Sequence, residues 1–371
     1  MSKDSGSNPM PNDKGKGPEL NLLSAFKRGA RLSAASLRVP LSTSSCFTQP
    51  GASSSTKFGQ PWAPSQPLGV LNMMTCPIRY SEFIELLRDI DTYQKDEKER
   101  SLLQIGSMIT TNNYTFLELA QDQIGSRSLR ALITRNQILD ALLFDSIRMN
   151  FWSLMNSNFG RHLIVTMIRA VDKPKKEILY KLTYDNTLEL AKQETGCIAL
   201  NEVFEEIRGP FRDLIFDLIA QNAGWLSFDP YGTHVVQNIL KLHIPSATQT
   251  IAESLDGMFF ELAMKRHGSY VVEKCLNSVF AREKVLAEFR VNDKEWVRMA
   301  NDKFGNFVVQ CALKVMKQSG MTDLLREFVG KLRPHFGEMK NGFGKNTLKV
   351  IEKDIGLRIL GLPDHLPGFF P

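Results

Sequence analysis

Six short stretches of the sequence repeat one chemical pattern at fixed distances after a glycine. The pattern occupies the first, second and fifth residues after that glycine. The six trios are Ser126, Arg127, Arg130; Arg161, His162, Val165; Cys197, Ile198, Asn201; Thr233, His234, Gln237; Ser269, Tyr270, Glu273; and Asn306, Phe307, Gln310. All middle members except Ile198 are planar groups that can stack on a base, an interaction that contributes about 1–3 kcal/mol. Most outer pairs can meet the edge of a base with hydrogen bonds.

The glycines before these trios are almost evenly spaced along the chain. They are Gly125, Gly160, Gly196, Gly232, Gly268 and Gly305, so the successive differences are 35, 36, 36, 36 and 37 residues. One phrase returns in close variants as YGTHVVQNIL, HGSYVVEKCL and FGNFVVQCAL, the last at residues 304–313. A fixed period near 36 residues indicates stacked repeats, in which each unit buries its apolar face against its neighbours.

Each repeat divides into three short helices that would position the trio. The first helix ends near the glycine, which permits a sharp reversal of the backbone, and the second begins at once. On the second helix, residues one and five after the glycine share a face, and residue two lies about 100° around the axis. Residues three and four, such as Val308 and Val309, are core positions. The sequence predicts an all-α, curved α-solenoid that exposes one trio per repeat.

The net charge of the chain does not by itself indicate a nucleic-acid-binding face. The sequence holds 46 Lys and Arg against 40 Asp and Glu, a formal charge of +6. Residues 1–81 contain nine of the basic and three of the acidic residues, so residues 82–371 carry 37 of each sign. A basic surface on the repeats must therefore come from an uneven distribution of charge between faces.

Sequence motifs for catalysis, metal binding and membrane insertion are missing. The six histidines lack metal-ligand spacing, and neither GxxxxGK[ST] nor a nucleophile motif occurs. The five cysteines form no CxxC pair, which fits a reducing compartment better than disulfides or a zinc site. No apolar run approaches the roughly 20 residues that cross a bilayer. We expect a soluble, non-enzymatic protein without cofactor, metal or membrane partner.

Composition divides the chain into four parts. Residues 1–78 are rich in Ser, Pro, Gly and Lys and predict a disordered tail. Within this tail, residues 22–39 share the acid-free, Arg-rich and Ser-rich composition of organelle targeting peptides, although a regulatory or flexible tail is the preferred interpretation. Residues 79–111 predict a helical N-terminal cap or a degenerate repeat, residues 112–355 the repeats with a C-terminal cap, and residues 356–371 a C-terminal tail.

The period, the recurrent phrase and the trios resemble the Pumilio (PUF) family of RNA-binding proteins over residues 112–355. The similarity is specific in the last three repeats and looser in the earlier ones. KLRPHFGEMKNGFGKNTLKVIEK, at residues 331–353, resembles the C-terminal capping half-repeat of that family, so the Gly305 repeat is the last of about six full repeats. The resemblance implies single-stranded mRNA as the partner, one base per repeat, an antiparallel strand and a preferred core that begins UGUA.

The resemblance also implies a role for each trio. The candidate base-edge residues, from the 5′ base onward, are Asn306 with Gln310 for uracil, Ser269 with Glu273 for guanine, Thr233 with Gln237 for uracil, Cys197 with Asn201 for adenine, and Ser126 with Arg130 for cytosine. The candidate stacking residues are Phe307, Tyr270, His234, His162 and Arg127. Val165 cannot hydrogen-bond a base, so its repeat would skip or tolerate a nucleotide. Lys265, Arg266 and Lys303 are candidates for phosphate contacts.

One other class of protein fits the period, namely a HEAT or armadillo α-solenoid that binds a peptide without RNA specificity. Its repeats are usually longer, about 40 residues or more. The resemblance instead implies binding to 3′ untranslated regions in the control of translation and mRNA stability, with repression or decay proteins on the convex face. We expect a cytoplasmic monomer. The nucleus or nucleolus, or an organelle if residues 22–39 act in targeting, are the alternatives.

Overall fold

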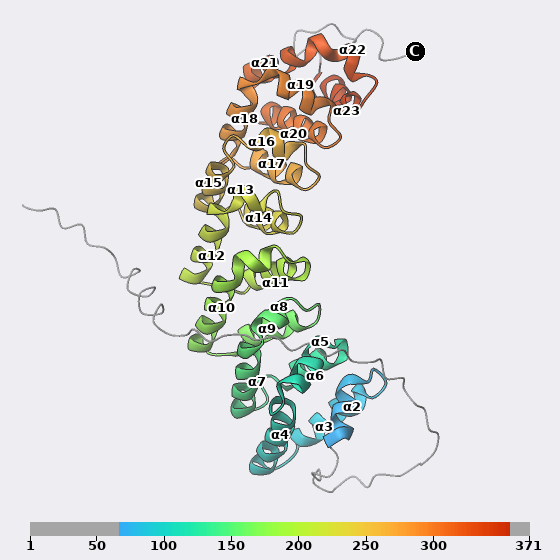
Figure 1. Cartoon of the computed structure of the whole chain (residues 1–371), viewed down its shortest axis with the longest axis vertical. Helices are drawn as coiled ribbons and strands as arrows, with labels where there is room; N and C mark the ends of the chain where they lie inside the picture. The colour runs from blue at the N-terminus through green and yellow to red at the C-terminus, as the bar shows by residue number, and fades with distance from the viewer. Residues whose placement is uncertain (1–66, 357–371) are drawn as a thin grey trace, which may run out of the picture. The chain divides into compact units, whose positions relative to one another are not determined.

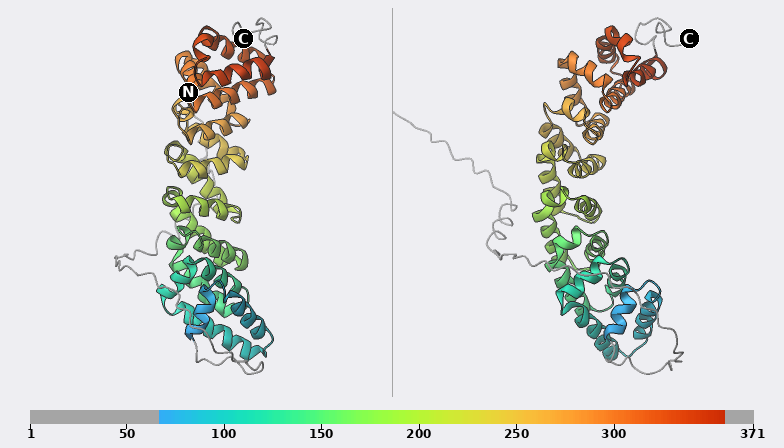
Figure 2. Two further views of the ribbon diagram at one scale, coloured as in Figure 1. Left: turned by 90° about the vertical axis from the view of Figure 1, so that its right-hand side faces the viewer. Right: turned by 45° about the vertical axis from the view of Figure 1, so that its right-hand side comes forward.

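Helices and turns make up residues 67–356, the part of the chain that the computed structural model describes (Figure 1). This part contains no strand, and its helices stack in a curved row (Figure 2). The predicted all-α solenoid is therefore confirmed. Residues 1–66 of the predicted N-terminal tail, and the predicted C-terminal tail beyond Gly356, lie outside the described residues. None of the described helices is both long and apolar enough to span a bilayer.

Each repeat consists of a leading helix, an inner helix that begins at or near the glycine, and an outer helix. The leading helices are α5 (Asn113–Gln121), α8 (Phe151–Met155), α13 (Ala223–Leu226), α16 (Phe259–Ala263), α19 (Asp293–Asn301) and α22 (Phe336–Met339). The inner helices are α6 (Gln123–Leu132), α9 (Gly160–Ala170), α11 (Glu194–Phe204), α14 (Gly232–Lys241), α17 (Gly268–Asn277), α20 (Gly305–Gln318) and α23 (Gly344–Val350). The outer helices are α4 (Lys95–Thr110), α7 (Gln137–Met149), α12 (Pro210–Gln221), α15 (Pro245–Ser254), α18 (Arg282–Val291) and α21 (Thr322–Leu332).

Helix α10 (Lys173–Ala191) is longer than the others because it has two roles. Tyr180, in its first half, packs on Phe211 of α12, so this half replaces an outer helix. The carbonyl oxygen of Leu190, near its end, lies against Gly196 of α11, so the second half replaces a leading helix. A 3₁₀ turn, η1 (Arg333–His335), precedes α22, and a π-helical turn, η2 (Ile351–Gly356), follows α23. The C-terminal half-repeat therefore supplies a last leading helix and a last inner helix.

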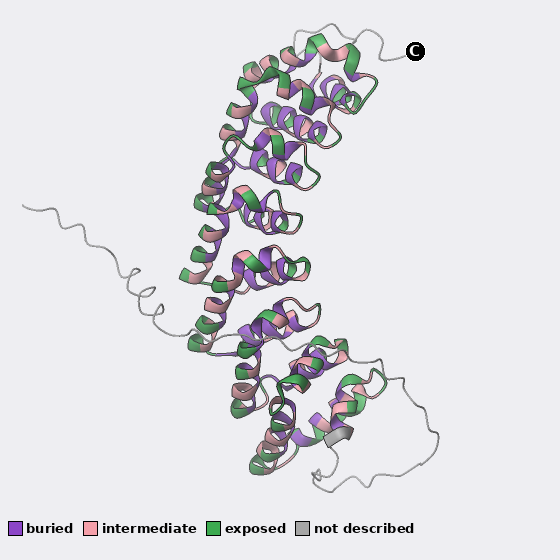
Figure 3. Cartoon of the chain, in the orientation of Figure 1, coloured by how far each residue is buried: buried purple, intermediate pink, exposed green. Residues whose placement is uncertain are grey.

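The core runs between the inner helices, each of which packs on the next from α6 to α23. The third and fourth residues after the glycine are fully buried in the later repeats, as predicted; they are Val235, Val236, Val271, Val272, Val308 and Val309. Figure 3 shows buried residues on the helix surfaces that face one another throughout the described part. Burial of aliphatic side chains between neighbouring units is the main source of stability in such an array.

The glycine before each trio has a different role from the predicted one. It does not reverse the backbone, because the glycines with positive φ in residues 67–356 are Gly209, Gly257, Gly320 and Gly356. Instead, the leading helix passes close to it. An added Cβ on Gly268 would lie 2.7 Å from the carbonyl oxygen of Leu262, a contact that no side chain tolerates. Glycine is required here for close packing of two backbone segments.

Helix α2 (Pro67–Thr75) lies inside the segment predicted as a disordered tail, so that prediction is wrong for residues 67–75. Val70 and Met74 are buried, and the Ser128 hydroxyl donates a 2.9 Å hydrogen bond to the carbonyl oxygen of Met74. The helix packs on α6 and precedes it in the inner row. Its sequence, PLGVLNMMT, contains no charged residue, so it lacks the polar and apolar faces that mark a helix. Helices α3 (Tyr80–Asp91) and α4 fill residues 79–111.

We expect Gly268→Ala to lower the stability of the array. The new Cβ must push against the backbone of Leu262, and overpacking of this kind costs about 1–3 kcal/mol. Gly330→Ala is the matched control, because Gly330 lies within α21 with no atom within 4 Å of an added Cβ, and alanine there should stabilise by about 0.5–1 kcal/mol. Urea unfolding followed by circular dichroism should give a lower midpoint for the first variant and an unchanged or higher one for the second. Equal midpoints would contradict this role of the glycine.

Candidate RNA interface

The first member of each trio is less exposed than predicted. Five of the six first members are buried, namely Ser126, Cys197, Thr233, Ser269 and Asn306. In two repeats the hydroxyl of this residue contacts the repeat that follows. The Ser126 hydroxyl donates to the carbonyl oxygen of Phe159 at 2.9 Å, and the Thr233 hydroxyl donates to that of His267 at 3.3 Å. The prediction that the whole trio is exposed is therefore wrong for this position.

The middle members are exposed, as stacking requires, in every trio except one. Tyr270 and Phe307 keep 55% and 54% of their surface accessible. Arg127 is also exposed, but its guanidinium carbon lies 4.7 Å from the ring centroid of Tyr80 in α3, so one of its faces is already covered. His162 is the exception, since it is half-buried beside α11. Two aromatic platforms are therefore fully formed in the last two repeats.

His234 is an exposed ring held by a second histidine. The two ring centroids of His234 and His267 are 5.9 Å apart in an edge-to-face arrangement. Partial burial lowers the pKa of His234, and the nearby His267 and Lys241 lower it further. The ring is therefore neutral at pH 7, which leaves it suited to stacking rather than to pairing with a phosphate.

The first and fifth residues of a trio are hydrogen-bonded to each other in two repeats. The Gln310 amide donates to Asn306 Oδ1 at 2.9 Å, and the Gln237 amide donates to the Thr233 hydroxyl at 3.2 Å. Asn306 is itself fixed, because its amide donates to the carbonyl oxygens of Asp302 and Lys303, both at 2.9 Å. The buried first residue thus orients the fifth, and Gln310 lines a cavity together with Glu273 and Phe307.

Glu273 differs from these two glutamines. Its carboxylate forms no hydrogen bond or ion pair within residues 67–356, and the Ser269 hydroxyl donates instead to the carbonyl oxygen of Arg266 at 3.3 Å. The side chain is half-buried, and this burial raises its pKa, although the adjacent Lys274 acts in the opposite direction. A half-buried carboxylate without a donor is ready to accept hydrogen bonds from a ligand.

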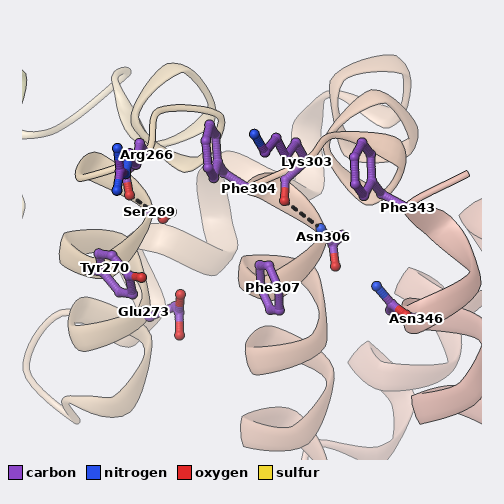
Figure 4. A pocket seen from close by; sticks show the side chains of 10 residues that line it. All are labelled: Arg266, Ser269, Tyr270, Glu273, Lys303, Phe304, Asn306, Phe307, Phe343 and Asn346. Atoms are coloured by element: carbon purple, nitrogen blue, oxygen red, sulfur yellow. Dashed lines mark hydrogen bonds between the residues drawn. The ribbon is translucent and has the colours of Figure 1, made fainter.

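A cavity of about 530 Å³ between α17, α20 and α23 is lined by the whole Gly268 trio and by Asn306 and Phe307 of the last trio. Gln310 lines a separate cavity, together with Glu273 and Phe307. Figure 4 shows the Glu273 carboxylate pointing into the space between the rings of Tyr270 and Phe307. Two of the three candidate phosphate ligands, Arg266 and Lys303, also line the cavity of about 530 Å³. The third candidate, Lys265, does not line it and lies 3.7 Å from Glu261 instead.

Three further lining residues, Phe304, Phe343 and Asn346, were not assigned from the sequence. An aromatic residue precedes the glycine in several repeats, and Phe304 and Phe343 belong to that series. Asn346 follows Gly344 by two residues, which is the stacking position of a trio. The capping half-repeat therefore contributes to the interface, and its glycine was the signal that could have shown it.

The middle of the inner row has a different character. A second cavity of about 520 Å³, beside α11, is lined by Asn201, Ile198 and three acidic residues, Glu194, Glu202 and Glu205, among others. Burial raises the pKa of the Cys197 thiol to about 11, so the thiol stays protonated. Two candidate base-edge atoms, Arg130 Nε and Asn201 Oδ1, are buried without a hydrogen-bond partner in residues 67–356. A ligand could bond to these two atoms only after the side chains move, and the acidic surroundings of Asn201 repel phosphate.

The fold and the interface define a helical repeat protein that presents a stacking side chain and a hydrogen-bonding pair in each of its C-terminal repeats. The chain belongs to the Pumilio family. The family model described as "Pumilio-family RNA binding repeat" matches residues 116–133, 186–220, 223–245, 259–285 and 295–319. Among curated proteins of Arabidopsis thaliana, "Putative pumilio homolog 21" is 56% identical over 362 residues, covering 94% of this chain and 69% of the relative. "Pumilio homolog 18" is 31% identical over 296 residues, covering 79% and 88%.

Solved structures show the same fold at low sequence identity. The structure named "Puf4 RNA binding domain bound to HO endonuclease RNA 3' UTR recognition sequence" superimposes with a TM-score of 0.66 at 20% identity. The match covers 76% of this chain and 87% of that domain. The curated relatives confirm the sequence-based assignment to the Pumilio family, and the solved structures confirm its fold.

We expect Glu273→Gln to stabilise the protein at neutral pH. The folded state raises the pKa of this carboxyl, so folding becomes less favourable as the pH rises from the unfolded pKa, about 4.3, through the folded one. The substitution removes this unfavourable ionisation, and its stabilising effect should vanish near pH 4. Thermal unfolding at pH 7 and pH 4 measures both effects.

Glu327→Gln is the control for the sign of this effect. Its pKa is lowered, chiefly by the hydrogen bond from Arg290. Loss of this carboxylate should therefore destabilise at pH 7, and the loss should fade as the pH falls through the folded pKa. If both variants shift the melting temperature in the same direction at pH 7, the argument from burial of Glu273 is wrong.

Proposed function

We propose that this chain binds single-stranded RNA in a sequence-specific way and reads a UGUA-like core in the 3′ untranslated regions of messenger RNAs. The observation that carries the proposal is the unpaired Glu273 carboxylate between the rings of Tyr270 and Phe307. Two aromatic faces can hold a flat base, and a carboxylate selects a base that presents two adjacent donors. Guanine alone presents N1–H and N2–H together. Arg266 and Lys303, on the wall of the cavity, can meet the phosphates.

The neighbouring trio supports uracil as the preceding base. The Gln310 amide is held by the buried Asn306, so a defined edge carrying both donor and acceptor capacity faces the ligand. Uracil offers acceptors at O2 and O4 on either side of the N3–H donor, and an amide can satisfy both kinds of group. Phe307 supplies the stack beside it.

Family membership supports RNA as the ligand. The matching repeats are described as RNA-binding, and the solved Puf4 domain is named as bound to a 3′ UTR recognition sequence. These relations favour RNA over the peptide ligand of a HEAT or armadillo scaffold. A role in the control of translation and mRNA stability, with repression or decay proteins on the convex face, is part of the proposal, as are a monomeric state and a cytoplasmic location.

We expect the protein to bind a UGUA-containing strand more tightly than the same strand with UCUA, by about 1–3 kcal/mol, or roughly 5- to 150-fold in Kd. Glu273→Gln should erode this preference, because an amide cannot accept two hydrogen bonds with the geometry of a carboxylate. Fluorescence anisotropy at one fixed salt concentration measures the Kd of the unaltered protein and of the variant for each of the two strands. Equal affinity of the unaltered protein for both strands would indicate phosphate attraction alone, which is blind to sequence.

Gln310→Ala provides the positional control for this experiment. The variant should weaken binding to strands with the 5′ uracil and leave the ratio between UGUA and UCUA unchanged, since Gln310 belongs to the adjacent repeat. A loss of guanine preference in this variant would mean that the assignment of bases to repeats is shifted.

A further inference from the structure

One glutamate joins two neighbouring inner helices in the middle of the row. Glu202, on α11, uses both of its carboxylate oxygens. Its Oε1 accepts from Arg161 Nε at 2.9 Å, and its Oε2 lies 3.4 Å from His162 Nδ1. Arg161 and His162 are the first two members of the trio on α9. Both polar members of that trio are therefore held by the next repeat.

The cluster is packed rather than loosely exposed. The side chains of Arg161 and Glu202 keep only 15% and 31% of their surface accessible, and Arg161 Nη1 also donates to the carbonyl oxygen of Asn158 at 2.6 Å. Burial lowers the pKa of His162 despite the opposing effect of Glu202, so the charged pair at pH 7 is Arg161 with Glu202. A base that uses the Arg161 Nε–H must separate a half-buried, charge-assisted pair and leave Glu202 Oε1 without its donor.

No other repeat carries an acid at the position of Glu202. The sixth residues after the six glycines are Ala131, Thr166, Glu202, Asn238, Lys274 and Cys311. This position faces the preceding inner helix, as the hydrogen bond from Asn277 to Cys311 Sγ at 3.3 Å also shows. An acid here therefore meets the trio of the repeat before it. The third member of that trio is the buried Val165, which has no polar atom to offer.

One independent observation sets this repeat apart from its neighbours. The segments matched by the family model stop at residue 133 and resume at residue 186, so the α9 repeat falls in the gap. The acidic cavity lies on the other side of α11, towards α14, and no residue of α9 lines it. There Glu194 and Glu205 add to the negative charge of Glu202, and no Lys or Arg is among the lining residues. Phosphates are therefore repelled beside the α11 repeat, which follows α9, whereas Arg266 and Lys303 attract them near the C-terminal end of the row.

We propose that Glu202 removes the α9 repeat from base reading, so that a bound strand carries one position at which all four bases are accepted. Counted from the base that faces Asn306 and Gln310, this is the fifth. The inference rests on the proposed function, because it needs RNA bound antiparallel along the inner row. Glu202 acts as a specificity-determining residue through Arg161 and touches no base itself.

The unaltered full-length protein provides the first test. Four strands that begin UGUA and differ only in the fifth base should bind with Kd values within about twofold of each other, since an unread position contributes little discrimination. In the same series, UCUA strands should still bind more weakly. A preference of fivefold or more at the fifth base would overturn the inference. Loss of the UGUA preference instead would reject the proposed function, so the two failures are distinguishable.

Glu202→Ala tests the cause. The released Arg161 guanidinium can present two parallel N–H donors to a base with two adjacent acceptors, as in cytosine O2 and N3 or guanine O6 and N7. The variant should therefore gain a preference for cytosine or guanine over adenine and uracil at the fifth base, about 5- to 150-fold. Arg161→Ala in the same background should abolish the gain.

Glu205→Ala is the matched control. It removes the same charge from the same cavity, but Glu205 holds neither Arg161 nor His162, so the fifth base should stay unread. A folded, UGUA-selective Glu202→Ala protein without any preference at the fifth base would overturn the role of Glu202. So would an equal gain in the Glu205→Ala protein, which would indicate a general effect of charge. If Glu202→Ala does not fold, the unaltered protein still decides whether the position is read.

Discussion

The contact between each repeat glycine and the backbone six residues before it sets the geometry of the array. At Gly125, Gly160, Gly196, Gly232, Gly268 and Gly305, an added Cβ would meet the carbonyl group of that earlier residue at 3.1 Å or less. The leading and inner helices can approach closely only because this atom is missing. Their separation fixes where the inner helix begins, and hence which way the first, second and fifth residues face. The chemistry of the interface therefore depends on a backbone contact that involves none of the interface side chains.

The sequence was sufficient to predict features that arise within one repeat. The period, the three helices, the buried Val308 and Val309 and the exposed Phe307 all follow from spacing around a glycine. Contacts between repeats could not be predicted in this way. The hydroxyl of Ser126 reaches a carbonyl 33 residues away, and Arg161 reaches a carboxylate 41 residues away. Such partners depend on how neighbouring units stack, which no local pattern records.

Two carboxylates of the inner row show how these contacts change the chemistry of a side chain. Glu202 has both oxygens matched by Arg161 and His162. Glu273 has no such donors among the described residues, and the unit after it presents Cys311 at the facing position. Neighbouring residues thus decide whether a carboxylate on an inner helix is free to bind a ligand or already bonded to donors within the protein. A prediction of base specificity that considers one repeat at a time would assign Glu202 and Glu273 the same role.

Helix α10 has a mechanical consequence for the array. Because one continuous helix is the last element of one repeat and the first of the next, no flexible loop separates these two units. Stacked repeats commonly unfold from their ends, with each unit coupled only to its neighbours. A shared helix strengthens that coupling at one junction, so fraying from either end should stop there. The array then consists of two groups of repeats that share one rigid helix. A truncation within residues 173–191 would destabilise both groups.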